Sequence, residues 1–367
     1  MTPFPTTERL AALRGRMTET ETDLVAVGPG PHMDWLLGFH PHPDERPCLL
    51  LVGRENEAFL MPALNAQGTR EHTDITFHEW ADADGPRDAL NQALEAIDGN
   101  RARGVAIDEA MRADFALLLL DNLPNARRDY TEATVGALRM RKDDREYQLL
   151  KENALINDRA MQAGFAALKP GMKETEVADI IRAHHASEGA RTEFSIVGTG
   201  GNGAFPHHAT GSTLLKEGDA VVIDVGARKD GFPSDMTRMA VIGSAPDGYQ
   251  AVHDIVNHAV EAALSATMPG IKAKEVDAAA RDIIAQAGYG EFFVHRTGHG
   301  LGIEVHEPPY ITATSETVLD EGMVFSIEPG IYLPGRFGIR LEEIVILRAD
   351  GPEILSELPR DVFIAEV

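Results

Sequence analysis

The stretch "AVVIDVGARKDGFPSDMTRMAVIG", residues 220–243, contains two apolar segments around a Lys-Asp-Gly turn signal. Such a pattern predicts a β-hairpin. Asp224 and Asp235 lie almost symmetrically about a midpoint between residues 229 and 230. A hairpin centred there places the two carboxylates opposite each other, with Cβ atoms about 5 Å apart. Because like charges at that distance repel, the hairpin predicts a group that neutralises them.

A second stretch, "GMVFSIEPGIYLPGRFGIRLEEIVIL" (residues 322–347), repeats the design, with Glu328 and Glu342 centred on Gly335. Each acid could simply face solvent, but Val, Ile and Phe surround both pairs. Four carboxylates held in apolar surroundings are destabilising unless they are protonated or cations lie between them. The two hairpins therefore predict a site for two divalent metal ions. Glu343 should point to the opposite face of its strand and should not be a ligand.

The stretch "RTGHGLGIEVHE" (residues 296–307) brings His299 and His306 close together in the sequence. A histidine in a glycine-rich segment is usually a turn residue, and a regular strand would send residues seven apart to opposite faces. The glycines at 298–302 allow a bend that brings both rings to one site. In that case His299 supplies a nitrogen ligand, and His306 stays free as a donor near the substrate.

The composition of the chain limits its function. The 367 residues include 34 Lys+Arg and 58 Asp+Glu, a formal charge of −24 that disfavours nucleic acid and anionic membranes as partners. A single cysteine, Cys48, excludes an intrachain disulfide framework and indicates a reducing compartment. The N-terminal stretch lacks a signal-peptide core, and the apolar run at 115–123 falls short of the ~20 residues that span a bilayer. We expect a soluble, cytoplasmic protein.

The chain length favours two domains. Residues 1–136 alternate helix-like and strand-like segments, which predicts an α/β domain with a parallel or mixed sheet. A charged amphipathic helix is expected at 142–168, near the start of the second domain. Beyond it, helices interleave with hairpins, which favours α+β architecture. The stretches 168–189 and 267–288 are similar enough to suggest an internal duplication.

Four segments together carry a family likeness: "IDVGARKDGFPSDMTR", "HRTGHGLGIEVHE", "SIEPGIY" and "GIRLEE". They resemble the signatures of the pita-bread metallopeptidases, above all the Xaa-Pro dipeptidases (prolidases) and the Xaa-Pro aminopeptidases. The resemblance is strong from about residue 140 to the end of the chain. It implies an α+β protein with a pita-bread (creatinase/aminopeptidase-like) catalytic domain at 137–367. A smaller creatinase-type α/β domain at 1–136 would precede it.

Position by position, the resemblance implies that two divalent ions bind to Asp224, Asp235, His299, Glu328 and Glu342. Mn²⁺ suits such oxygen-rich ligands, and Co²⁺, Zn²⁺ and Fe²⁺ are also acceptable. The substrate site is expected to be lined by His207, His295, His306 and Arg340. Glu328 would also transfer the proton, and His306 and His207 would stabilise the oxyanion. Arg340 would either pair with a substrate carboxylate or orient Glu342.

The resemblance implies a dinuclear-metal hydrolase that cleaves the Xaa-Pro bond of dipeptides. Two alternatives stay open: an Xaa-Pro aminopeptidase acting on longer peptides, and a small-molecule hydrolase or lyase on the same metal scaffold. A non-catalytic binding protein is disfavoured because every ligand position is retained. The likeness also implies a homodimer, in which the segment "MDWLLGFHPHPDERP" (residues 33–47) is a candidate loop for capping a neighbour's site.

Overall fold

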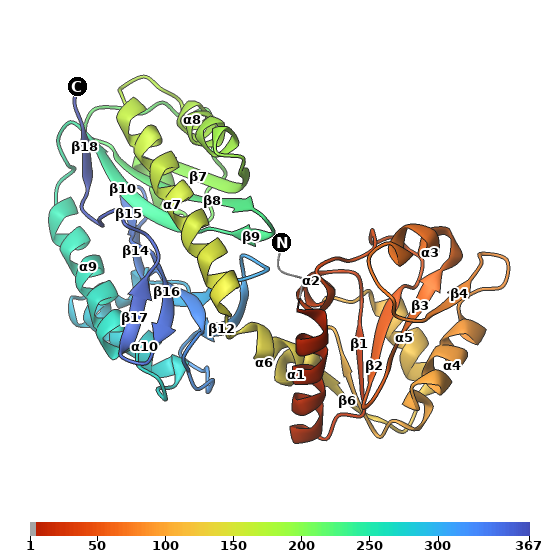
Figure 1. The fold of residues 1–367 in the computed structure, drawn as a ribbon. Helices are drawn as coiled ribbons and strands as arrows, with labels where there is room; N and C mark the ends of the chain where they lie inside the picture. The colour runs from red at the N-terminus through yellow and green to blue at the C-terminus, as the bar shows by residue number, and fades with distance from the viewer. Residues whose placement is uncertain (1–4) are drawn as a thin grey trace. The chain divides into compact units, whose positions relative to one another are not determined.

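The computed structural model describes residues 5–367 and divides between Arg139 and Met140 into two compact units (Figure 1). We call them the N-terminal unit and the C-terminal unit. The N-terminal unit contains the helices α1 (Thr6–Glu19), α2 (Pro31–Leu37), α3 (Ala63–Arg70), α4 (Arg87–Ala96), α5 (Ala113–Asn122) and α6 (Val135–Arg139). Its strands are β1 (Leu24–Val27), β2 (Leu49–Gly53), β3 (Glu57–Pro62), β4 (Phe77–Trp80), β5 (Gly104–Ile107) and β6 (Arg127–Tyr130).

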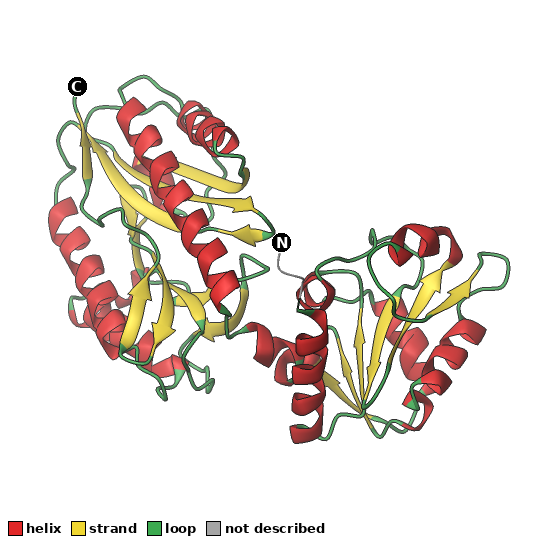
Figure 2. Ribbon diagram, viewed as in Figure 1, coloured by secondary structure: helices red, strands yellow, loops and turns green. Residues whose placement is uncertain are grey.

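The six strands of the N-terminal unit form one mixed sheet in the order β4-β3-β2-β1-β5-β6. The pairs β1/β2 and β2/β3 are antiparallel, and the other neighbours are parallel. Helices α4 and α5 pack on one face, and α1 and α6 lie on the other (Figure 2). This confirms the mixed α/β prediction. Strand β6 has no apolar pattern that predicts it, because this edge strand exposes Arg, Asp and Tyr side chains and is held by its backbone pairing with β5.

The C-terminal unit contains the long helices α7 (Asp144–Ala167), α8 (Glu174–Ser187), α9 (Tyr249–Ala266) and α10 (Ala273–Gln286). One sheet consists of β7 (Arg191–Thr199), β8 (Ala220–Lys229), β9 (Phe232–Pro233), β10 (Met236–Ile242) and β18 (Phe363–Ala365). The second sheet consists of β11 (Gly298–Gly300), β12 (Glu307–Ile311), β13 (Val324–Ile327), β16 (Glu343–Arg348) and β17 (Gly351–Ile354). A short ribbon joins β14 (Gly330–Leu333) to β15 (Phe337–Arg340).

Apolar faces hold the helices of the C-terminal unit against its sheets. Helices α7 and α8 bury their apolar residues on one face of β8 and β10. Helices α9 and α10 share the core on the other face with β13, β15 and β16. A capping box at Asp143 and Glu146 starts the predicted helix α7, and Gly171 at φ 85° follows its end.

The two similar stretches of sequence fold alike. Helices α8 and α10 both begin after a lysine N-cap, at Lys173 and Lys272. Each of these lysines forms an isolated antiparallel bridge, to Leu214 and to Val318 respectively. The likeness between the stretches therefore extends from the helix caps to the segments that the caps contact, as an internal duplication would produce.

The aspartate hairpin forms as predicted, but its centre is displaced by one residue. Asp230 and Gly231 have φ values of 51° and 87°, so these two residues form the turn. The register places Asp224 opposite Thr237, and the predicted direct pairing of Asp224 with Asp235 is wrong. Asp235 precedes Thr237 by two residues, so both aspartates still share one face of the ladder as diagonal neighbours.

The glutamate hairpin has the predicted register. Gly330 pairs with Arg340 in the β14–β15 ribbon, and Ile327 pairs with Glu343 in the adjoining ladder. Both ladders are centred on residue 335. Glu328 and Glu342 therefore lie opposite each other at the junction between the β13–β16 ladder and the β14–β15 ladder. Gly335, at φ 74°, forms the turn.

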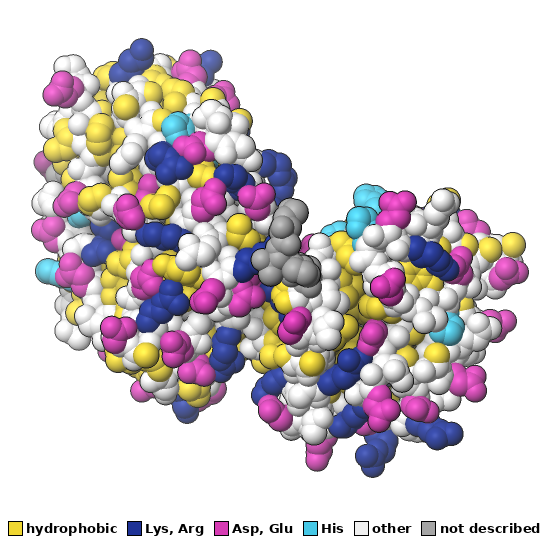
Figure 3. Space-filling view, in the orientation of Figure 1, with side chains coloured by type: hydrophobic (Ala, Val, Ile, Leu, Met, Phe, Trp, Pro, Cys, Tyr) yellow, Lys and Arg dark blue, Asp and Glu magenta, His cyan; other side chains and the backbone are white. Residues whose placement is uncertain are grey.

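Acidic and basic side chains are interspersed over the face of the molecule shown in Figure 3. This view contains no broad basic area of the kind that binds nucleic acid. Among residues 5–367, no helix is long and apolar enough to cross a bilayer.

Candidate metal centre

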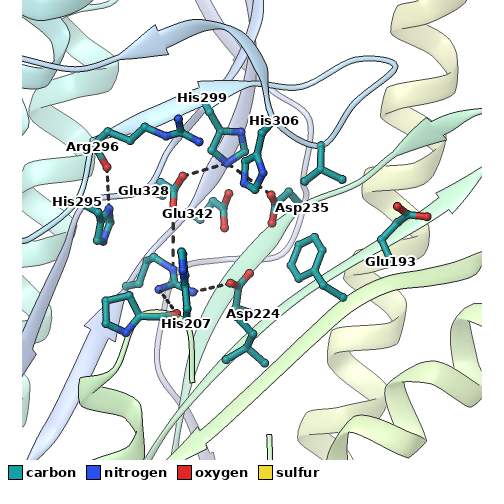
Figure 4. A pocket seen from close by; sticks show the side chains of 15 residues that line it. Glu193, His207, Asp224, Asp235, His295, Arg296, His299, His306, Glu328 and Glu342 are labelled. Carbon is teal, nitrogen blue, oxygen red and sulfur yellow. Dashed lines mark hydrogen bonds and ion pairs between the residues drawn. The ribbon is translucent and has the colours of Figure 1, made fainter. Parts of the chain in front are cut away.

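A pocket of about 660 Å³ in the C-terminal unit collects all nine predicted site residues (Figure 4). They come from the 205–211 segment, β8, the β9–β10 junction, the 295–306 segment and the glutamate hairpin. The structure therefore brings together His207, Asp224, Asp235, His295, His299, His306, Glu328, Arg340 and Glu342. Glu343 does not line this pocket, because its carboxylate faces away and pairs with Arg238 and Arg360.

Three side chains form the core of the pocket. Ligand atoms of Asp235, His299 and Glu342 all lie within 4.8 Å of one another, and the three residues are buried. The Nε2 atom of His299 lies 3.2 Å from Glu328 Oε1 and 3.7 Å from Asp235 Oδ2. Its Nδ1 atom lies 3.1 Å from the Gly300 carbonyl oxygen, where it donates as N–H. Nε2 therefore faces carboxylate oxygens of two acids, a position in which a metal ion can replace a proton as their shared partner.

The pKa shifts and unpaired oxygens of the carboxylates indicate a cation site. Burial, together with the charges of Glu342, Asp224 and Glu328, raises the pKa of Asp235 well above its usual range. Burial and the charges of Glu328 and Asp224 do the same to the pKa of Glu342. Asp224 Oδ1 and Glu342 Oε1 are buried without a hydrogen-bond partner among the described residues. Because an unpaired buried carboxylate oxygen is costly, this donor set fits divalent metal ions.

Arg340 and His295 use their polar atoms inside the protein. Arg340 Nη2 lies 2.5 Å from Asp224 Oδ2, Nε donates to Thr237 Oγ1, and Nη1 donates to the Tyr332 hydroxyl. His295 Nδ1 lies 2.7 Å from the Arg296 carbonyl oxygen, and Nε2 lies 2.8 Å from the Tyr332 hydroxyl. A consistent set of donors runs from Arg340 to Tyr332 to His295. Both predicted residues therefore line the pocket, and their hydrogen bonds hold neighbouring residues of the pocket in place.

Glu328 differs from the other acids. Burial alone would raise its pKa, but the hydrogen bond and charge of His299, with the charges of His295 and Arg340, lower the pKa to about 2. Ser326 Oγ donates to Glu328 Oε1 at 3.0 Å and accepts from the His299 backbone N–H at 2.9 Å. Ser326 thus aligns a carboxylate that stays ionised at neutral pH.

The predicted glycine bend is present between His299 and Gly300, where the ladder register shifts. A Cβ atom on Gly298 would lie 1.9 Å from the Ser326 carbonyl oxygen, and one on Gly300 would lie 2.3 Å from that of Pro308. Only glycine fits such close backbone approaches. The bend brings the rings of His299 and His306 to a centroid distance of 4.2 Å, and the His306 side chain is exposed.

Sequence reasoning missed the residues that support the site, namely Thr237, Ser326 and Tyr332. Thr237 Oγ1 donates to Glu342 Oε2 at 2.9 Å and joins that acid to Arg340. All three residues lie within two to four positions of predicted ligands, on the same face of a strand or just beyond a turn. That spacing is the one signal that could have identified them. Their partners became visible only when distant strands were brought together.

Family models match both parts of the chain. The model described as metallopeptidase family M24 matches residues 148–349, and the model described as creatinase/prolidase N-terminal domain matches residues 9–141. The chain therefore belongs to metallopeptidase family M24 and has the pita-bread fold with a creatinase-type N-terminal domain. Members of this family bind divalent metal ions, which agrees with the donor set of the pocket.

Individual relatives are similar along nearly their whole length. A probable dipeptidase PepE of Mycobacterium tuberculosis is 36% identical over 98% of this chain and 96% of the relative. An Xaa-Pro dipeptidase of Pyrococcus horikoshii is 31% identical over 94% of this chain and 96% of the relative. The crystal structure of a prolidase from Thermococcus sibiricus superposes with a TM-score of 0.89, at 32% identity and full coverage of both chains.

Proposed function

We propose that this metallopeptidase is an Xaa-Pro dipeptidase. The single observation that carries the proposal is the pocket in which four carboxylates and one imidazole converge beside two exposed histidines. The relatives described as dipeptidases or prolidases cover nearly all of this chain and supply the substrate class.

We assign the binding of two divalent metal ions to Asp224, Asp235, His299, Glu328 and Glu342. Mn²⁺ is the proposed metal, because four carboxylate ligands and one imidazole provide mostly hard oxygen donors. When bound, such ions lower the pKa of a water and polarise the scissile carbonyl.

The residues of the chain supply the remaining chemistry. Glu328, which stays ionised and is aligned by Ser326, takes the proton from the attacking water and returns it to the leaving proline nitrogen. His306 and His207 are exposed in the pocket and lie on different segments of the chain. Their ring N–H groups are available to stabilise the oxyanion that forms on the carbonyl oxygen when the water attacks the carbonyl carbon.

Arg296 is the better candidate to bind a substrate carboxylate. Arg340 is buried and already bonds to Asp224, Tyr332 and Thr237, which supports its role in orienting the ligands. Arg296 lines the same pocket, half-buried, and its guanidinium lies 4.7 Å from the centre of the Tyr310 ring. An arginine stacked in this way keeps its planar N–H groups free for a bidentate carboxylate contact.

The test is a comparison of kcat/KM for Ala-Pro, Ala-Pro-amide and Ala-Pro-Ala on enzyme reconstituted with Mn²⁺. In a dipeptidase, a cationic side chain of the enzyme binds the free carboxylate of the substrate. Amidation of that carboxylate should cost several kcal/mol of transition-state binding, so kcat/KM for Ala-Pro should exceed that for the amide on the order of 10²-fold or more. If Ala-Pro-Ala is the best substrate, the enzyme is an aminopeptidase for longer peptides. If all three fail and a non-peptide amide is cleaved, the proposal is wrong.

We also propose that the protein is a cytoplasmic homodimer. The buried free thiol of Cys48 suits a reducing compartment. The segment expected to cap a neighbour's site contains Trp35, which is buried beneath Arg9, and His42, which is exposed. Sedimentation at micromolar concentration should give twice the monomer mass of 39.8 kDa, and a monomer alone would exclude the dimer.

A further inference from the structure

The segment that carries His207 is held by a buried carboxylate outside the candidate metal centre. Glu174 is the first residue of α8 and is fully buried. Its Oε1 accepts from the Thr199 backbone N–H at 2.9 Å and from Asn202 Nδ2 at 2.8 Å. Its Oε2 accepts from the Gly211 backbone N–H at 3.0 Å and from His208 Nε2 at 2.9 Å. One carboxylate thus ties down both ends of the segment 199–211.

The two adjacent histidines of this segment have different surroundings. His208 is partly buried, and its ring is bound to Glu174. His207 is exposed in the pocket and reaches it from the loop, near Asp224 in the view of Figure 4. The two residues are consecutive in the chain. Anchoring the His208 ring therefore restricts the positions that the His207 ring can take.

The opposite side of the segment is also restrained. Gly203 contacts β15 so closely that a Cβ atom on Gly338 would lie 2.0 Å from the Gly203 carbonyl oxygen. The Pro206 carbonyl oxygen accepts from Arg340 Nη1 at 3.3 Å. The segment is therefore clamped between β15, next to the candidate metal ligands, and the N-terminus of α8.

We propose that Glu174 and His208 are positioning residues that set the location of His207 in the active site. The four hydrogen bonds to Glu174 hold both ends of this segment and the ring of His208 to one side chain. The positive end of the α8 helix dipole further favours an anionic carboxylate at this point. The inference rests on the proposed function, in which His207 contacts the reacting carbonyl.

Replacing Glu174 tests the proposal in a double-mutant cycle. Glu174→Gln should lower kcat on Ala-Pro roughly 10-fold, the scale of losses from supporting residues around a site, with KM and metal content nearly unchanged. In a His207→Ala background the same substitution should cause no further loss of kcat, because its effect passes through His207. Equal losses in both backgrounds, or loss of bound metal, would overturn the proposal.

Two further variants separate positioning from general destabilisation. Glu176→Gln removes an exposed carboxylate from the same helical turn. This carboxylate accepts from the Lys173 backbone N–H, and its replacement should leave kcat unchanged. His208→Ala should reproduce the loss seen with Glu174→Gln, and His208→Gln, which keeps an N–H donor, should restore most of the activity. If both His208 variants are as active as the wild type, the proposal is wrong.

A measurement without substrate keeps this inference distinct from the proposed function. Hydrogen exchange in peptides covering 199–211 should become faster in Glu174→Gln and stay unchanged in Glu176→Gln. Unchanged exchange in Glu174→Gln would contradict the anchoring role. If the wild type cleaves a substrate other than Ala-Pro, the proposed function is wrong. The double-mutant cycle of Glu174 and His207, measured on that other substrate, still tests the role of Glu174.

Discussion

The Thr237 hydroxyl shows how one uncharged residue links the charged groups of the site. It accepts from Arg340 and donates to Glu342, while Arg340 also pairs with Asp224. One guanidinium is thus shared between acids from both hairpins. It cannot neutralise four carboxylates, and Asp235 has no arginine within ion-pairing distance in the described chain. The remaining negative charge is what bound cations must balance.

Replacing Asp235 tests this balance. Asp235→Asn removes one proposed anionic ligand at nearly constant volume. It should weaken metal binding at least about 10-fold, because even the loss of residues outside a ligand set costs that much. Turnover should fall with it. Isothermal titration with Mn²⁺ and elemental analysis measure the first effect, and kcat on Ala-Pro measures the second. Unchanged metal occupancy together with an unchanged rate would refute the role of the aspartate hairpin.

His306 should behave differently from the proposed metal ligands. His306→Ala should leave the metal content unchanged and lower kcat on the order of 10²-fold, as expected for loss of one donor to the transition state. The T-shaped contact with His299 is lost in this variant, so His299→Ala serves as the comparison that should lose metal. A parallel loss of metal in His306→Ala would make His306 a ligand instead.

At the scale of elements, the C-terminal unit depends on contacts that join helices to the sheet behind the site. His185 on α8 is fully buried, with Nε2 3.0 Å from Asn157 Oδ1 on α7 and Nδ1 2.9 Å from Thr192 Oγ1 on β7. Asn157 in turn donates to the carbonyl oxygen of Val225, next to Asp224. Burial, together with the charge of His184, lowers the pKa of His185 to about 4.

This contact predicts a pH-dependent stability. Because the folded-state pKa lies below the usual 6.5, the unfolded chain binds more protons between these values, and stability falls as the pH falls through that window. Between pH 7 and pH 5 the wild type should lose about 2 kcal/mol more free energy of unfolding than His185→Gln. Urea titrations of both proteins at each pH measure the difference. Equal losses would show that His185 is not the group responsible.

At the scale of the whole molecule, metal ions and folding should be linked in one unit. The candidate ligands all belong to the C-terminal unit, and the two tryptophans, Trp35 and Trp80, both belong to the N-terminal unit. Intrinsic tryptophan fluorescence therefore reports on the unit without the metal site. Circular dichroism reports on both.

Removing the metal should destabilise the C-terminal unit selectively. A chelator should abolish activity and lower the unfolding midpoint measured by circular dichroism more than that measured by tryptophan fluorescence. Restoring Mn²⁺ to about 100 times its Kd should recover about 2.7 kcal/mol per site. Activity or an unchanged dichroism midpoint in protein shown to be metal-free by elemental analysis would contradict the metal mechanism.

The sequence alone determined the features that depend on local chemistry. Turn glycines, helix caps and alternating apolar residues identified both hairpins, helix α7 and the bend at His299, because each depends on neighbouring residues. The glutamate hairpin was placed in the correct register because its loop is symmetric about Gly335. The motifs also indicated the family, and the family models confirm it.

Only the tertiary structure decided how the charged groups share partners. The aspartate register depended on which two residues took positive φ, and a displacement of one residue changed the partner of Asp224 from Asp235 to Thr237. Arg340 bonds to Asp224, which lies 116 positions away in the sequence. Glu174 bonds to residues of the His207 segment that lie up to 37 positions away. Such pairings follow from the packing of whole strands and helices, which local sequence patterns do not encode.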